Sequence, residues 1–208
     1  MFPTANVLVA DDTTFTAANR KEFTNRIATT DVDAVIISKE QFQKIPMSEE
    51  YQKDFIQEQI DSIIAMQEEL KANKGGNPST TIQLESRRKS LQNRLNKLAD
   101  AKRDTDNITF EETGIDYVFA DEAQAYKNLA YTTNLSNVAD MGKPDGNQIT
   151  FDMKMKTDYV RNMQGGKGVV FGTATPVMNS PVEAYAMLQY LCPEELEKRG
   201  IYNLDNFI

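Results

Sequence analysis

Two short apolar runs each end in side chains that could act on a phosphate group. Residues 117–120 are followed by Asp-Glu-Ala-Gln at 121–124, and residues 168–171 are followed by Gly-Thr-Ala-Thr at 172–175. Two adjacent carboxylates at the end of a buried strand are costly unless a cation or strong donors meet them. One carboxylate could hold a water-coordinated Mg²⁺ while the other orients a water for phosphoanhydride hydrolysis. The threonine hydroxyls could then contact the terminal phosphate.

Neither pattern decides the chemistry alone. An apolar run followed by Asp-Glu is common in solvated turns, and this is the simplest interpretation of residues 121–124 by themselves. The second run, ending in Thr-Ala-Thr-Pro about fifty residues later, adds support for a nucleotide site. A carboxylate hydrolase such as a glycosidase fits poorly, because its two acids should face each other about 5–9 Å apart across a cleft.

The composition narrows the chemistry further. The 208 residues contain no His and one Cys, Cys192, which excludes imidazole catalysis, His-ligated zinc and a disulfide framework, and fits a reducing cytosol. A net charge of −8 counts against a compact basic DNA-binding module, but a basic groove on one face stays open. No apolar run approaches the roughly 18 residues of a membrane helix, and the N-terminus lacks a signal-peptide pattern. We therefore expect a cytoplasmic protein with no membrane partner.

The elements that must position these residues alternate along the chain. Helical patterns lie near Ala17–Ala28, near Ile149–Met163 and after Ser180, where Ser180-Pro181-Val182-Glu183 combines a capping box with proline in the first turn. Short continuous apolar runs predict the strands of a parallel sheet covered on both faces. The alternation predicts an α/β fold whose ligands bind beyond the carboxyl ends of the strands. The predicted strands are Asn6–Ala10, Ala34–Ser38, Tyr117–Ala120 and Gly168–Phe171.

Residues 47–105 interrupt this alternation with two long helical patterns. Apolar side chains recur at near-heptad spacing in both, and Lys74-Gly75-Gly76-Asn77-Pro78 separates them, which predicts an antiparallel helical hairpin. An arm of 25 residues is roughly 37 Å long, so we expect the hairpin to protrude. The predicted domains are a lobe of residues 1–46 and 106–208 and a hairpin insertion of residues 47–105. The recurring residues are Ile56, Ile60, Ile63, Leu70, Leu84, Leu91, Leu95 and Leu98.

These segments together resemble a known family. Asp116–Leu129 (DYVFADEAQAYKNL) and Gly168–Ser180 (GVVFGTATPVMNS) look like motifs II and III of superfamily-two helicases, and most resemble the Swi/Snf-type ATPases. Asn6–Phe15 and Asp33–Phe42 lie where that family has its Ia and Ib segments. The whole chain is similar to the helicase-like region of helicase–methylase proteins of phages and conjugative elements. The resemblance implies part of an N-terminal RecA-like lobe of the P-loop NTPase type, with a parallel sheet.

The resemblance also implies roles for the motif residues in binding ATP and Mg²⁺. Asp121 would organise the magnesium nucleotide, holding the metal through water, and Glu122 would be the general base or orient the attacking water. Gln124 stands where the family usually has His, so it can relay hydrogen bonds but not a proton. Thr173 and Thr175 match the two threonines thought to couple the nucleotide state to DNA contact.

The complete protein would hold double-stranded DNA through phosphate contacts that tolerate any sequence. Lys127 and Asn128 match the Lys-Asn pair that follows motif II, and Ala174 replaces a glycine of motif III. Each basic candidate taken alone is more simply explained as part of the solvated surface. The candidates for phosphate contact are Lys39, Lys127, Lys154, Lys156, Arg161 and Lys167.

The sequence contains no G-x-x-x-x-G-K-[ST] phosphate loop, and the nearest Gly-Lys, at 166–167, leads into a predicted strand. In the family this loop lies upstream of residue 1, and a second lobe with the arginine finger lies downstream of residue 208. We therefore expect a partial lobe that hydrolyses negligible ATP by itself, because hydrolysis needs the phosphate-loop segment and the second lobe. The exposed edge of its sheet could pair with another copy of the chain. The alternative is a catalytically inactive interaction module that uses the hairpin as a docking arm, which the replacements at Gln124 and Ala174 would suit.

Overall fold

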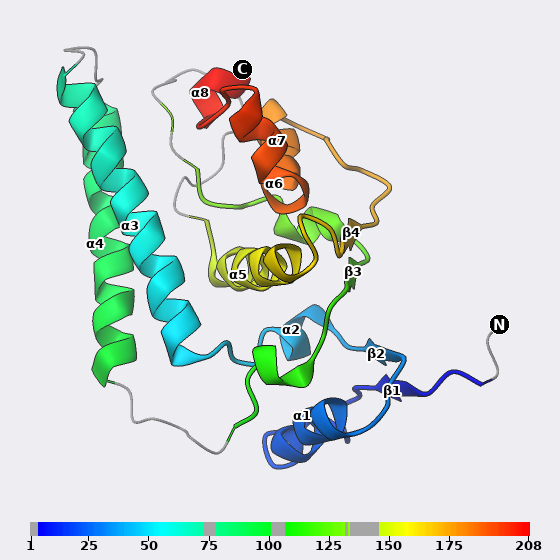
Figure 1. Cartoon of the computed structure of the whole chain (residues 1–208). Coiled ribbons are helices and arrows are strands. Elements are labelled where there is room, and N and C mark those ends of the chain that lie inside the picture. The colour runs from blue at the N-terminus through cyan, green and yellow to red at the C-terminus, as the bar shows by residue number, and fades with distance from the viewer. Residues whose placement is uncertain (1–3, 73–77, 101–106, 132, 134–145) are drawn as a thin grey trace. The chain divides into compact units, whose positions relative to one another are not determined.

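The computed structural model describes residues 4–72, 78–100, 107–131, 133 and 146–208 (Figure 1). The chain divides into two compact units. The first unit comprises Met1–Glu49 and Lys102–Ile115, and the second comprises residues 50–101 and 116–208. All of the motif residues that could bind nucleotide belong to the second unit.

The first unit is built on a pair of parallel strands. Strand β1 (Val7–Val9) pairs with β2 (Ala34–Ile36), with Leu8 opposite Val35. Phe23 of helix α1 (Arg20–Thr29) packs edge-to-face on Phe15, with their ring centroids 5.3 Å apart. Helix α2 (Lys39–Phe42) begins with a capping box formed by Ser38 and Gln41, and the short helix η1 (Glu111–Thr113) completes the unit.

The second unit contains the strands that carry the motifs. Strand β3 (Val118–Ala120) pairs in parallel with β4 (Val169–Phe171), with Ala120 opposite Phe171. All four predicted strands are therefore confirmed, with shorter bounds. They form two separate two-stranded sheets, and no ladder joins them within the described ranges. The single RecA-like sheet stays a prediction.

Helices pack on one side of the β3–β4 pair and leave the other side exposed. The ring of Tyr190 is fully buried, with its centroid 5.3 Å from that of Phe171. On the other side, Phe119 is 73% exposed and Val170, its partner in the register, is 44% exposed. The expectation that both faces are covered is therefore not met in this chain, because aromatic and β-branched residues favour strands whether or not both faces are buried. The helices of this region are η2 (Ala123–Tyr126), α5 (Gln148–Met163), α6 (Pro181–Leu191), α7 (Pro193–Lys198) and α8 (Leu204–Phe207).

The predicted hairpin consists of helices α3 (Glu49–Ala72) and α4 (Pro78–Asp100), which lie side by side in Figure 1. Its seam is the predicted one, with Ile56, Ile60 and Ile63 packed against Leu84 and Leu91. Of the predicted breaker, residues 74–77 lie outside the described residues, and Pro78 is the first residue of α4. How far the hairpin protrudes stays a prediction.

Two aromatic contacts anchor the hairpin on α5. Phe55 of α3 meets Phe151 edge-to-face at 5.3 Å. The Arg94 guanidinium of α4 lies 3.8 Å from the centroid of the same Phe151 ring, an arrangement in which the positive charge meets the electron-rich ring face. The hairpin is therefore packed against α5 by both of its helices.

Helix α6 begins as predicted at Ser180, whose hydroxyl accepts from the Val182 amide at 3.2 Å, with Pro181 in the first turn. The predicted capping box is wrong, however. The Glu183 carboxylate reaches past the cap and accepts from the Met178 amide at 2.7 Å, because the Lys127 ammonium, 2.7 Å from its other oxygen, holds it there.

Residues 165–168 lie between the end of helix α5 and the start of β4, so they lead into a strand, as their sequence predicted, and do not form a phosphate loop before a helix. Gly165 and Gly168 both have positive φ, at 59° and 90°. A Cβ at Gly168 would lie 2.8 Å from Val160 Cγ1 and 2.9 Å from the Asp116 carbonyl oxygen, whereas a Cβ at Gly165 would meet nothing within 4 Å. Position 168 therefore requires glycine on two grounds.

Replacing Gly168 by Ala should lower the free energy of unfolding by roughly 2–4 kcal/mol, because both the φ angle and the close contacts are unfavourable. Gly165→Ala is the matched control, since only its φ is unfavourable, and it should cost about 1–2 kcal/mol. Urea denaturation of the two variants tests this. Equal losses would show that the contacts with Val160 and Asp116 do not matter.

Helix α5 also buries an ion pair, in which Lys156 Nζ lies 2.7 Å from Asp152 Oδ2 and the lysine side chain is 0% exposed. Lys156→Met would leave Asp152 without this partner in the protein interior. We expect a loss of about 3–5 kcal/mol, much of which the double variant Asp152→Leu/Lys156→Met should recover. Thermal and urea unfolding measure both values, and a double variant no more stable than Lys156→Met would contradict this account.

Candidate functional site

The two acidic motif residues are the first two residues after β3, at the carboxyl end of the strand. Backbone hydrogen bonds continue past the ladder, because the Gly172 amide donates to the Ala120 oxygen at 2.9 Å and the Ala123 amide donates to the Gly172 oxygen at 3.0 Å. The loop after β3 and the loop after β4 therefore leave the sheet side by side. We call them the acidic loop (residues 121–127) and the threonine loop (residues 172–179).

The Gln124 side chain joins the two loops. Its Oε1 accepts from the Thr173 hydroxyl at 2.6 Å, and its Nε2 donates to Glu122 Oε2. The Thr173 hydroxyl oxygen in turn accepts from the Thr175 amide at 3.1 Å. A carboxylate can only accept hydrogen bonds, and the Thr173 hydroxyl needs an acceptor, so this orientation of the amide satisfies both neighbours. Glu122, Gln124, Thr173 and Thr175 therefore form one hydrogen-bonded chain.

Glu122 has a left-handed backbone conformation, with φ 52° and ψ 45°, and it alone among the described non-glycine residues has positive φ. This conformation costs of order 1–2 kcal/mol for a residue with a Cβ. The turn allows Asp121 Oδ1 to accept from the Glu122 amide at 2.9 Å. Ala174, which replaces a family glycine, has no positive φ, so this replacement strains nothing in the threonine loop.

Within the described residues, no cluster of three or more acidic, His or Cys side chains could hold a metal ion. Asp121 instead presents one exposed carboxylate at the start of the acidic loop. Mg²⁺ is usually held by one or two carboxylates together with waters and substrate phosphates rather than by an all-protein cage. The donor set therefore fits a Mg²⁺ that arrives with a nucleotide, and it does not fit a preformed metal site.

The structure contradicts two of the predicted DNA contacts, Lys156 and Arg161. The Lys156 side chain is fully buried against Asp152, and Arg161 is 3% exposed, bound to the Gly166 and Leu191 carbonyl oxygens and to the Glu194 carboxylate. Neither side chain can reach a DNA phosphate in this conformation, because both stabilise the packing of α5 instead.

The other basic candidates differ in how freely they could bind an anion. Lys127 is bound to Glu183 at 2.7 Å, and Lys154 lies 2.5 Å from both oxygens of Asp158. Lys39 is exposed, with Glu40 3.7 Å away, and Lys167 is exposed between α5 and β4. Lys39 and Lys167 are therefore the candidates best placed to contact DNA phosphates, and their role stays a prediction.

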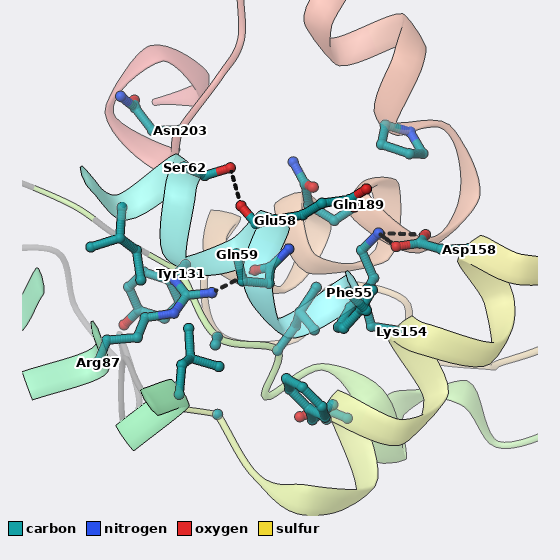
Figure 2. A pocket seen from close by; sticks show the side chains of 18 of the residues that line it. Phe55, Glu58, Gln59, Ser62, Arg87, Tyr131, Lys154, Asp158, Gln189 and Asn203 are labelled. Atoms are coloured by element: carbon teal, nitrogen blue, oxygen red, sulfur yellow. Dashed lines mark hydrogen bonds and ion pairs between the residues drawn. The ribbon is translucent and has the colours of Figure 1, made fainter. Parts of the chain in front are cut away.

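A cavity of about 640 Å³ lies apart from these loops, among the hairpin, α5, α6 and α7. Figure 2 shows its Lys154–Asp158 pair, and Arg87 Nη2 donates to Gln59 Oε1 at 3.3 Å. The volume suits a small ligand, but none of the five motif residues that could bind nucleotide lines the cavity. Sequence reasoning missed it because its walls come from segments far apart in the chain.

Comparison with known proteins gives a family and one informative relative. A family described as "Probable helicase domain" matches residues 1–208. "Defense against restriction protein B" of Escherichia phage P1 is 31% identical over 207 residues, which cover 96% of this chain and 8% of the phage protein. No solved structure matches, and no helix in the described part of the chain is long and apolar enough to cross a membrane. The narrower Swi/Snf assignment stays a prediction.

Replacing Glu122 by Gly should give a protein about 1 kcal/mol more stable than Glu122→Ala, because glycine adopts the left-handed conformation without strain. Glu122→Ala is the matched control, since it loses the same hydrogen bond from Gln124 but keeps the Cβ. Chemical denaturation compares the free energy of unfolding of the two variants. A Glu122→Gly variant no more stable than Glu122→Ala would contradict the strained geometry of the acidic loop.

Proposed function

Because this chain belongs to the family of probable helicase domains, we propose that it is part of the ATP-binding motor lobe of an ATP-dependent DNA helicase or translocase. The observation that supports this best is the Gln124 bridge between Glu122 and Thr173. A motor must transmit the state of its nucleotide to its DNA contacts, and this amide links the acidic loop to the threonine loop directly.

In this proposal Asp121 would hold, through water, a Mg²⁺ that comes with ATP, and the metal would supply positive charge to the phosphates. The Glu122 carboxylate accepts a proton from the attacking water or orients it, since its second oxygen, Oε1, is not used by Gln124. The Gln124 amide keeps Glu122 in place without carrying a proton. If Glu122 gains or loses a contact, the Gln124 side chain should shift with it. Its hydrogen bond to Thr173 would then change the position of the threonine loop.

The proposed lobe depends on parts outside this chain. Of the phage relative, the matched region covers 8%, so a phosphate loop and a second lobe can lie elsewhere in a protein of that kind. The name of that relative supports a role for the whole protein on the DNA of a mobile genetic element that faces restriction. Double-stranded DNA would be held through phosphate contacts, for which Lys39 and Lys167 are the exposed candidates.

The alternative, an inactive interaction module with the hairpin as docking arm, relies on the two replaced family residues. The structure weakens that argument. Gln124 forms both hydrogen bonds of the bridge, and Ala174 has no positive φ, so Gln124 still joins the two loops and Ala174 adds no left-handed strain. An interaction role would have to rest on the hairpin alone.

The experiment is ATP hydrolysis by the intact protein that carries this chain, measured with Mg²⁺ and double-stranded DNA. We expect Glu122→Gln to lower kcat by about 10²–10⁴-fold, the range for loss of a general base. ATP binding should change little. Glu85→Gln, on the exposed surface of α4, is the control and should hydrolyse ATP normally.

The 208-residue chain alone should show no turnover above background, because the phosphate loop and second lobe are not in it. If the intact protein neither binds nor hydrolyses ATP, the motor proposal is wrong. Robust turnover by the chain alone, abolished by Glu122→Gln, would instead contradict the partial lobe.

A further inference from the structure

The Glu183 carboxylate accepts hydrogen bonds from four donor groups of three residues. Its Oε1 accepts from Lys127 Nζ at 2.7 Å and from Asn179 Nδ2 at 3.3 Å. Its Oε2 accepts from the Met178 amide at 2.7 Å and from the Asn179 amide at 3.3 Å. Both oxygens are therefore occupied, and each donor belongs to the acidic loop or to the threonine loop.

This contact is shielded from water. The side chain of Glu183 is 10% exposed and that of Lys127 is 27% exposed. Burial raises the pKa of the Glu183 carboxyl, but the hydrogen bonds from Lys127, Met178 and Asn179 outweigh it and hold the pKa below its ordinary value of 4.5. Removing one member of such a group leaves buried polar atoms without their partner, which costs more than the loss of an exposed ion pair.

The position of the contact complements the Gln124 bridge. Lys127 lies at the end of η2, after the acidic residues, and Met178 and Asn179 lie at the end of the threonine loop, just before Ser180 caps α6. The two loops are therefore joined along their length: by backbone hydrogen bonds where they leave the β3–β4 pair, at Gln124–Thr173, and at Glu183 where they end.

We propose that Lys127 and Glu183 are a positioning pair for the hydrolysis proposed above: a clamp that holds the acidic loop and the threonine loop in one fixed arrangement. This inference rests on the proposed function. It also assigns the Lys127 ammonium to Glu183 rather than to a DNA phosphate. A movement of the threonine loop would be transmitted to the acidic loop, and so to Glu122, by the Gln124–Thr173 hydrogen bond and by the clamp. Both contacts must therefore be intact for the two loops to move together.

The test uses the intact protein, with Lys127→Met and Glu183→Gln to break the clamp and Lys127→Arg to preserve its charge and donors. Lys198→Met is the control, because it breaks the exposed Lys198–Glu195 pair, whose Nζ and Oε1 lie 2.6 Å apart. Two quantities are measured: amide hydrogen exchange of the peptides that cover residues 172–183, and kcat and KM for ATP.

Breaking the clamp should speed exchange at the Met178 and Asn179 amides by about tenfold or more. In Glu183→Gln both amides lose their charged acceptor, and in Lys127→Met that carboxylate loses the ammonium that holds it in place. The value of kcat should fall by about 10–100-fold, as for other small misplacements of catalytic groups. KM should change by less than about twofold, because ground-state binding is not affected. Lys127→Arg should stay within about threefold of the parent, and Lys198→Met should match it.

Unchanged exchange in Lys127→Met and Glu183→Gln would show that the clamp does not form. Faster exchange with unchanged kcat would show that the clamp is only structural, and would overturn the positioning role. If the parent protein hydrolyses no ATP, the proposed function fails and the positioning role fails with it. Exchange at residues 178 and 179 would still show, in that case, whether the clamp exists.

Discussion

The parallel pairing of β3 with β4 is the constraint on which every feature of the site depends. Because Ala120 lies opposite Phe171, the chain leaves both strands at the same end of the sheet and at the same level. Residues that follow two strands so paired must be neighbours, whatever their separation in the sequence. A shift of this register by one residue would move Thr173 out of reach of Gln124, and the acidic and threonine loops would lose the side-chain hydrogen bond that joins them.

The two loops then satisfy one another's polar groups instead of relying on solvent. A neutral amide connects Glu122 with Thr173, and a shielded carboxylate, Glu183, gathers donors from both loops. The left-handed conformation of Glu122 is the cost of this arrangement. Strain of this kind persists only where the surrounding contacts hold it. The Gln124 bridge and the Lys127–Glu183 clamp are the contacts that hold the acidic loop in this conformation.

The sequence predicted the local features of the fold and missed the long-range ones. The four strands, the hairpin seam and the Ser180 cap follow from apolar spacing and cap residues within a few positions of one another, so they could be recognised in the sequence. The predicted capping box is wrong because the Glu183 carboxylate binds Lys127 instead. Lys127 lies far from Glu183 in the sequence, so local spacing could not indicate this contact. Lys156 and Arg161 appeared to be surface cations because charge normally indicates exposure, and only tertiary packing shows that α5 buries them.

The most direct measurement is an experimental structure of the intact protein with Mg²⁺ and a non-hydrolysable ATP analogue. We expect the terminal phosphate beside the carboxyl ends of β3 and β4, with the metal near Asp121 and the Gln124 amide still between Glu122 and Thr173. A nucleotide bound elsewhere, in the cavity beside the hairpin for example, or the acidic and threonine loops apart in the loaded state, would contradict it.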